Sequence, residues 1–149
     1  MRHFLFGLTM RIASWNVNSA KARLEHITDW LTGDNTDILM MQEIKSQDEN
    51  FPRDAFKDLG WHIAVHGQKS YNGVAIASRF PIEDVMNGLP GDDEDEQARY
   101  IEATINGVRV GNIYLPNGNP VPGSKFEYKI AWMARHGGTV DVAMQLFSD

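Results

Sequence analysis

The 149-residue sequence contains no cysteine, which excludes both a disulfide framework and a thiolate metal site. Zinc would have to depend on histidine and carboxylate ligands, and the five histidines show no metal-ligand spacing. A surplus of basic residues is also missing: the net charge is −6, which argues against a protein held to nucleic acid by bulk electrostatics. No apolar run is long enough to span a membrane, so no membrane partner and a cytoplasmic location are expected.

The residues that are present suit one globular domain. Hydrophobic residues make up 42% and aromatic residues 10% of the chain, enough for a real core at this length. Acidic residues concentrate at positions 92–96, which we expect to form a solvated loop that repels phosphate locally. Segment 1–9 is apolar but too short for a membrane span or a secretory signal, and we expect it to be an appended, poorly ordered segment.

Two short strands that end in polar side chains form the most informative pattern. Residues 38–41 predict a buried strand with Glu43 just beyond it, and residues 11–15 predict an earlier strand ending at Asn16. Residues 22–31 between them carry helical apolar spacing, so the strands should be parallel and both side chains should emerge at one sheet edge. Carboxylate and amide oxygens suit a magnesium pocket. The alternatives are a solvated strand boundary at Glu43 and a turn-forming asparagine at Asn16.

The rest of the chain predicts mainly antiparallel strands. Residues 61–65 and 73–78 read as strands joined by a turn-rich connector. Residues 100–105 and 108–115 read as two more, linked by Asn106-Gly107, which is the strongest short hairpin signal. These pairs and the parallel unit together predict an α/β fold with mixed sheets.

Five motifs occur in a fixed order along the chain. They are Trp15-Asn16-Val17-Asn18-Ser19, Leu39-Met40-Met41-Gln42-Glu43-Ile44-Lys45, Tyr71-Asn72-Gly73-Val74-Ala75-Ile76, Gln97-Ala98-Arg99-Tyr100-Ile101-Glu102 and Tyr114-Leu115-Pro116-Asn117-Gly118. With this order and spacing the chain resembles, over residues 10–133, the exonuclease III family of DNA-repair nucleases within the endonuclease/exonuclease/phosphatase superfamily. The resemblance implies a four-layer α/β sandwich, two packed sheets with helices outside, here truncated.

The resemblance also implies roles for seven side chains. Glu43 and Asn16 would form the site for Mg²⁺, or Mn²⁺, with Glu43 as the ligand and Asn16 helping to position a metal ligand, a water or the phosphate. Tyr114 would act as a catalytic residue by donating a hydrogen bond to the scissile phosphate, and Arg99 would bind the DNA backbone. Without the family, Tyr114 fits a core tyrosine and Arg99 a surface residue beside Glu102. The other DNA- or phosphate-binding residues are Asn72, Lys45 and Lys69.

The implied reaction is metal-assisted hydrolysis of phosphodiesters in duplex DNA by a monomer. Both exonuclease activity at 3′ ends and endonuclease activity at abasic sites fit the residues present. The family's Gly-Asp-x-Asn and Ser-Asp-His motifs do not occur in this sequence, so we expect residues 10–135 to be the N-terminal part of the nuclease domain and this chain to be inactive.

The pattern of the family ends after Arg135. Residues 136–149 are expected to be a divergent tail, read from a shifted frame or a truncated reading frame. Only the first sheet and part of the second should then form, and the uncovered apolar surface would favour aggregation or loose packing.

Two other functional classes fit the same residues. The first is a superfamily phosphatase that acts on a small phosphorylated molecule, although Gln97-Ala98-Arg99 and Tyr114-Leu115-Pro116 favour the nuclease. The second is a non-catalytic binding remnant, which the absent motifs support. Abasic DNA assayed against inositol phosphates separates the first class from the nuclease, and a circular dichroism melt tests whether the chain folds.

Overall fold

A computed structural model describes residues 9–137 and 144–145 of the chain. The predicted segment 1–9 and the predicted tail 136–149 therefore lie mostly outside the described residues. None of the helices in the described ranges is long and apolar enough to cross a membrane. The elements are β1 (Ile12–Asn16), α1 (Leu24–Gly33), β2 (Ile38–Gln42), the 3₁₀ helix η1 (Asp48–Asn50), α2 (Arg53–Asp58), β3 (His62–His66), β4 (Val74–Ser78), β5 (Glu83–Asn87), β6 (Tyr100–Ile105), β7 (Val108–Ile113), α3 (Ser124–Gly137) and β8 (Met144–Gln145).

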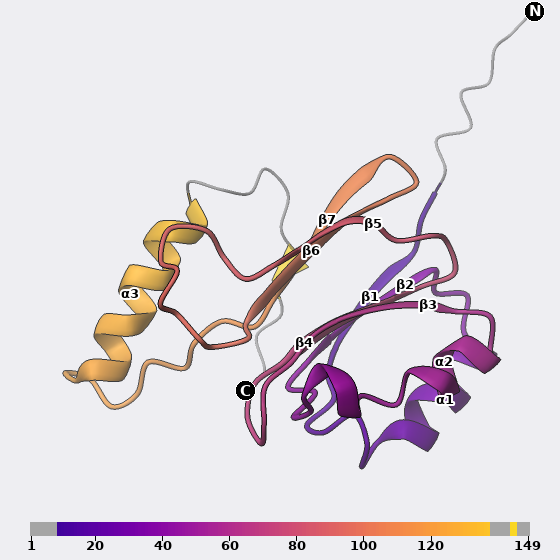
Figure 1. Ribbon diagram of the computed structural model, residues 1–149, viewed down its shortest axis with the longest axis horizontal. Helices are drawn as coiled ribbons and strands as arrows, with labels where there is room; N and C mark the ends of the chain where they lie inside the picture. The colour runs from indigo at the N-terminus through magenta and orange to yellow at the C-terminus, as the bar shows by residue number, and fades with distance from the viewer. Residues whose placement is uncertain (1–8, 138–143, 146–149) are drawn as a thin grey trace, which may run out of the picture.

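The elements stack in four layers, with a pair of sheets between helices (Figure 1). Sheet A has the strand order β1-β2-β4-β3, and sheet B has the order β5-β6-β7-β8. On the outer face of sheet A, α1 and α2 bury Ile27, Leu31 and Phe56. On the outer face of sheet B, α3 buries Trp132 against Tyr100. The predicted four-layer α/β sandwich is thus confirmed, and both sheets have four strands.

The two sheets meet through an apolar core that follows the period of two in a strand. Met40 and Ile76 of sheet A pack in one buried cluster with Ile101 and Val110 of sheet B. Alternate residues of β2, such as Leu39, belong instead to the cluster under the helices. Because both faces of β2 are covered, its sequence is apolar almost throughout rather than alternating.

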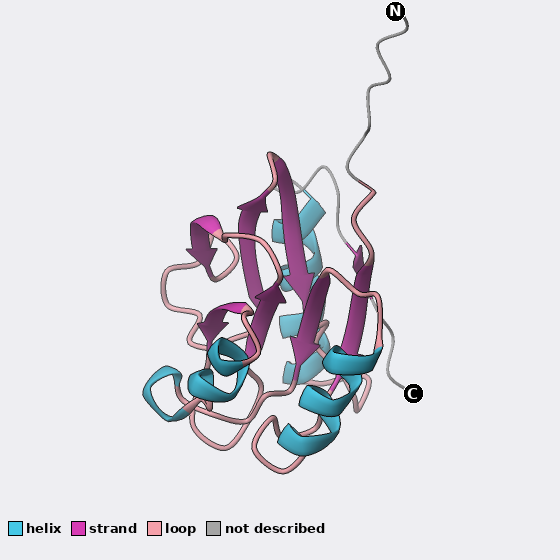
Figure 2. Cartoon of the chain, turned by 90° about the vertical axis from the view of Figure 1, so that its right-hand side faces the viewer, coloured by secondary structure: helices cyan, strands magenta, loops and turns pink. Residues whose placement is uncertain are grey.

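The register of the parallel pair positions the later site. β1 and β2 run parallel, with Ile12 opposite Ile38 and Asn16 opposite Gln42, so the two strands end side by side. Figure 2 shows the strands of the two sheets and the helices that cover them. The predicted parallel unit is confirmed. The strands predicted at 61–65 and 73–78 form β3 and β4, which pair antiparallel, and β4 also pairs antiparallel with β2.

The hairpin of sheet B forms at the predicted Asn106-Gly107 turn. Both residues have positive φ, 50° and 75°, which is the backbone of a type I′ turn. β6 has the predicted bounds, whereas β7 ends at Ile113, two residues before the predicted end.

Among the elements that the sequence did not predict, β5 and α2 were missed for physical reasons. β5 pairs with β6 at the edge of sheet B through an irregular register, and its residues are mostly exposed and without alternation. α2 has six residues, too few for a helical period to be read. Two residues of the predicted divergent tail form β8, which pairs parallel with β7.

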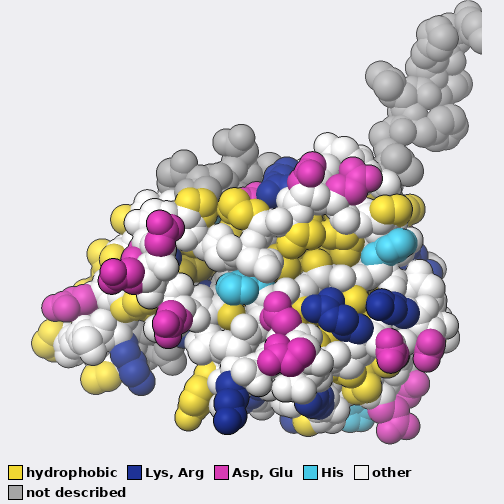
Figure 3. Space-filling view, viewed as in Figure 1, with side chains coloured by type: hydrophobic (Ala, Val, Ile, Leu, Met, Phe, Trp, Pro, Cys, Tyr) yellow, Lys and Arg dark blue, Asp and Glu magenta, His cyan; other side chains and the backbone are white. Residues whose placement is uncertain are grey.

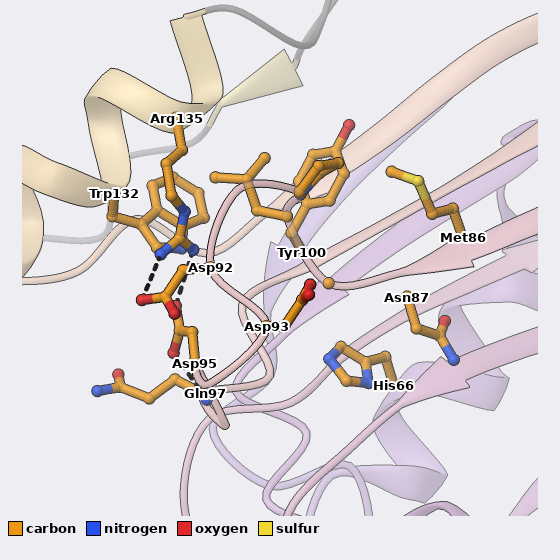
Figure 4. Close-up of a pocket in the computed structure, with 13 residues that line it drawn as sticks. His66, Met86, Asn87, Asp92, Asp93, Asp95, Gln97, Tyr100, Trp132 and Arg135 are labelled. Atoms are coloured by element: carbon orange, nitrogen blue, oxygen red, sulfur yellow. Dashed lines mark hydrogen bonds and ion pairs between the residues drawn. The ribbon is translucent and has the colours of Figure 1, made fainter.

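The expectation of a solvated acidic loop holds for four of residues 92–96 and is wrong for Asp95. Its carboxylate accepts a hydrogen bond from Nη2 of Arg135 at 2.8 Å (Figure 4). Its Oδ2 also accepts a hydrogen bond from the hydroxyl of Tyr128 at 2.8 Å. The Asp95 side chain is 7% exposed, so α3 supplies the charge that makes its burial tolerable. The loop is thereby fastened to α3.

Candidate functional site

Polar side chains from both sheets converge where strands end. Asn16 is the last residue of β1, and Glu43 directly follows β2. Tyr114 directly follows β7, and Arg99 directly precedes β6. The structure therefore brings together the four residues that the sequence singled out most strongly.

Glu43 is the centre of this cluster. Its Oε1 accepts hydrogen bonds from the hydroxyl of Tyr114 at 2.6 Å and from Nδ2 of Asn16 at 3.1 Å. Its Oε2 lies 3.6 Å from Nζ of Lys45, which also donates to Oδ1 of Asn18 at 2.6 Å. The carboxylate thus joins one donor from sheet B to donors from sheet A.

The backbone at Glu43 adopts an uncommon conformation. Its φ is 52°, a left-handed value that non-glycine residues rarely take. The carbonyl of Glu43 accepts a hydrogen bond from the amide of Ser19 at 2.8 Å, which holds the turn in place. Such strain persists where the surroundings determine a side chain's position, and it is frequent at functional sites.

The surroundings of Glu43 keep it ionised. Burial raises its pKa, but the hydrogen bonds from Tyr114 and Asn16 and the charge of Lys45 outweigh burial, so the pKa is lowered. The carboxylate is therefore negatively charged at neutral pH and available to a cation.

Tyr114 is held as a protonated donor with an arginine on its ring. Burial, followed by its hydrogen bond to Glu43, raises the pKa of Tyr114 to about 12. Cζ of Arg99 lies 4.7 Å from the centre of the ring, and Nε of Arg99 donates to Oε1 of Gln97 at 2.7 Å. Glu102, the alternative partner of Arg99, is instead bound to Arg109 at 2.8 Å.

Asn16 acts on the carboxylate through its amide nitrogen. Its Oδ1 accepts a hydrogen bond from the backbone N–H of Asn18 at 3.2 Å, while its Nδ2 donates to Glu43. Asn16 thereby orients the carboxylate of Glu43, and its Oδ1 has a second lone pair beside the one that accepts from Asn18. Within the described ranges no group of three or more His, Asp or Glu side chains is placed to hold a metal ion.

The other predicted contact residues occupy neighbouring loops. Nδ2 of Asn72 donates to Oε1 of Gln68 at 3.1 Å, and the same oxygen accepts from the amide of Ala98 at 2.7 Å. Gln68 therefore links the Asn72 loop to the segment that carries Arg99. Lys69 is exposed on this loop, and its side chain joins none of the cluster's hydrogen bonds in the described part of the chain.

A cavity of about 290 Å³ adjoins the cluster on its Arg99 side and is lined by Gln97, Lys125 and Tyr128, among others. A second cavity, of about 360 Å³, lies between the acidic loop and α3, as Figure 4 shows. Neither Glu43 nor Tyr114 lines the second cavity, so this cavity is distinct from the cluster around Glu43.

Sequence reasoning missed a buried amide network directly below the cluster. Nε2 of Gln42 donates to Oδ1 of Asn112 at 2.8 Å and to Oγ of Ser14 at 2.9 Å. Nδ2 of Asn112 donates to the carbonyls of Met41 and Ala75, each at 2.9 Å. The available signal was an asparagine on the same face of β7 as Val108 and Val110, a position that alternation predicts to be apolar.

Comparison with known proteins supplies the family. The sequence pattern of the endonuclease/exonuclease/phosphatase family matches residues 13–142. The chain belongs to this family. The predicted resemblance is therefore confirmed, while the individual roles assigned to the seven side chains stay predictions.

Members of the family that resemble this chain are about twice its length. The chain is 34% identical over 113 residues to exodeoxyribonuclease III of Haemophilus influenzae, covering 73% of this chain and 42% of that protein. It is 30% identical over 128 residues to an exodeoxyribonuclease of Bacillus subtilis, covering 83% and 49%. The chain spans half or less of the length of these two relatives.

Solved structures of family members superpose closely on the fold. The 3′–5′ exonuclease NExo from Neisseria meningitidis gives a TM-score of 0.84 at 45% identity, with 87% of this chain and 50% of that chain covered. An AP endonuclease from Archaeoglobus fulgidus gives a TM-score of 0.84 at 41% identity, with 89% and 53% covered. These likenesses agree with the described sandwich, again over about half of each neighbour.

Proposed function

We propose that this site belongs to an enzyme that hydrolyses phosphodiester bonds in DNA. The observation that carries the proposal is the 2.6 Å contact across the two sheets between the hydroxyl of Tyr114 and the carboxylate of Glu43, with Arg99 on the tyrosine ring. The relatives support it, since they include two exodeoxyribonucleases and an AP endonuclease. A further structure, a 3′ phosphatase NExo variant bound to a product DNA hairpin, is 45% identical.

Each side chain of the cluster has a task that follows from its geometry. The protonated phenol of Tyr114 can turn from Glu43 to donate to a phosphoryl oxygen as negative charge develops there. Arg99 places a permanent positive charge beside the same ring. Asn16 and Lys45 hold the carboxylate of Glu43 in position.

A hard divalent cation, Mg²⁺ or Mn²⁺, fits Oε2 of Glu43. Mg²⁺ commonly binds proteins through one or two carboxylates and retains several waters, so one ionised carboxylate suffices to hold it weakly. When bound, such a cation polarises a phosphoryl oxygen and stabilises the leaving oxyanion.

We also propose that this 149-residue chain by itself turns over DNA negligibly. In the described ranges, no second carboxylate and no histidine joins the hydrogen bonds of Glu43, so no general base stands beside it. Catalytic groups act as a unit, and loss of members costs orders of magnitude in rate.

Binding, which does not require turnover, tests the proposed function. We expect Mg²⁺ to shift the NMR signals of Glu43, Tyr114 and Asn16, and an abasic DNA duplex to shift those of Arg99 and Asn72. Glu43→Gln should abolish the response to Mg²⁺, because the amide lacks the charge that attracts the ion. Glu49→Gln, a neutralised exposed acid on η1, is the matched control and should respond as the unaltered chain does.

Several outcomes would contradict the proposal. A Mg²⁺ response that persists in Glu43→Gln rules out the metal role of Glu43. Inositol phosphate that shifts the cluster more strongly than DNA favours the phosphatase reading. Turnover of abasic duplex well above that of Glu43→Gln would refute the predicted inactivity while supporting the nuclease class.

A further inference from the structure

The amide network between the sheets is fully enclosed. Asn112 has no exposed surface and Gln42 is 3% exposed. Both polar ends of the Asn112 amide are satisfied: its nitrogen donates to the Met41 and Ala75 carbonyls, and its oxygen accepts from Gln42. Because a buried polar group without a partner is costly, these bonds constrain the side chains that make them.

These bonds run from one sheet to the other. Asn112 lies on β7 of sheet B, whereas Gln42 and Met41 lie on β2 and Ala75 on β4 of sheet A. The core between the sheets is otherwise apolar, and apolar attraction is not directional. Hydrogen bonds have narrow ranges of length and angle. The network therefore fixes how β7 sits over β2 more tightly than the apolar core does.

The network lies directly behind the candidate site. Gln42 immediately precedes Glu43, and Asn112 lies two residues before Tyr114. Glu43 and Tyr114 belong to different sheets, so their 2.6 Å contact depends on how the sheets are aligned at this end.

We propose that Asn112 and Gln42 are positioning residues that align the two sheets at their strand ends and thereby hold the hydroxyl of Tyr114 against Glu43. This inference rests on the proposed function, which gives the contact between Tyr114 and Glu43 its role in catalysis. Neither side chain touches the reacting atoms; both act through the residues that follow them. A purely structural role would lower the stability of the chain and leave the Tyr114 contact in place once folded.

The experiment measures the Tyr114 contact without any enzymatic assay. The ¹³Cζ chemical shift of tyrosine responds to hydrogen bonding of the phenol, and Tyr71, which is 70% exposed, provides a solvated reference in the same molecule. The tyrosine ¹³Cζ signal that disappears in Tyr114→Phe is the signal of Tyr114. At neutral pH, we expect Gln42→Met and Asn112→Leu to move the Tyr114 signal toward that of Tyr71.

The matched control is Ile105→Val, which removes one methyl group from the same inter-sheet core. It should lower Tm and leave the Tyr114 signal unmoved. If Asn112→Leu fails to fold, the milder Gln42→Met decides. An unmoved Tyr114 signal in Gln42→Met, or an equal movement in Ile105→Val, overturns the proposal. Absence of DNA or Mg²⁺ binding would contradict the proposed function alone, since this signal reports on the free protein.

Discussion

The carboxylate of Glu43 depends on neighbouring side chains for its charge. Burial works against ionisation, while Tyr114, Asn16 and Lys45 favour it and together lower the pKa. The folded-state pKa of Glu43 therefore lies below that of the unfolded chain. Ionised Glu43 stabilises the fold fully above the unfolded pKa, and this contribution is lost as the pH falls through the folded pKa.

Replacing Tyr114 by phenylalanine should raise the pKa of Glu43, because it removes a hydrogen bond to the charged form. We expect the variant to lose about 1 kcal/mol of unfolding free energy at pH 7. This is the usual contribution of a hydrogen bond to a charged group, lowered because solvent partly screens the carboxylate. The difference from the unaltered chain should vanish at acid pH. Carboxyl ¹³C NMR titration and urea unfolding measure both effects.

Tyr71→Phe is the control for this change, since Tyr71 is exposed and lies outside the cluster. It should alter neither the Glu43 titration nor stability. A Glu43 pKa that is the same in Tyr114→Phe and in the unaltered chain would mean that the hydroxyl contributes nothing to ionisation.

At the scale of elements, the acidic loop and α3 stabilise each other. Burial raises the pKa of Asp95, but the hydrogen bonds from Arg135, the Gln97 amide and Tyr128 outweigh it, so the pKa is lowered. The stability that ionised Asp95 contributes is thus present at neutral pH and is lost as the pH falls through the lowered pKa.

Asp95→Asn should loosen the packing of the loop on α3. The variant removes the charge from a partly buried ion pair while Asp92 still pairs with Arg135 at 3.4 Å, so a loss of about 2 kcal/mol in unfolding free energy at pH 7 is expected. Asp93→Asn, in the exposed part of the same loop, should change it by less than about 0.5 kcal/mol. Denaturant unfolding at neutral and acid pH measures both variants, and a deficit of equal size at acid pH would contradict the role of the Asp95 charge.

At the scale of the whole molecule, charge limits how DNA can be held. The net charge is −6, and Figure 3 shows Lys and Arg interspersed with Asp and Glu on one face. Under the proposed function, attraction to a phosphate backbone is expected to come from cations near the cluster. Arg99, Lys45 and Lys69 are the candidates.

The salt dependence of DNA binding should reflect these three cations. Each neutralised phosphate contributes about 0.9 to the slope of log K against log salt, so a slope of roughly −2 to −3 is expected. Lys69→Gln should reduce the slope by about 1, while Lys57→Gln, on α2, should leave it unchanged. Fluorescence anisotropy across a salt series measures the slope, and a much steeper one would indicate a larger basic surface.

Elements whose signals lie in neighbouring residues could be predicted from the amino-acid sequence. The change from apolar to polar residues at strand ends identified Asn16 and Glu43, and Asn106-Gly107 identified the hairpin. Both could be predicted because strand burial and turn conformation depend on residues that are neighbours in the sequence. The order and spacing of the five motifs then indicated the family. The edge strand β5 and the short helix α2 were not predicted, because their apolar residues show no clear strand or helix period.

Only the tertiary structure decided which distant side chains meet. The Tyr114 contact with Glu43 spans 71 positions, as does the bond from Asn112 to Met41, and each depends on how two sheets pack. The burial of Asp95 likewise depends on Arg135 and Tyr128 arriving from α3. Such contacts arise from the packing of layers, which local residue patterns do not encode, and they set the charge and position of the groups in the candidate site.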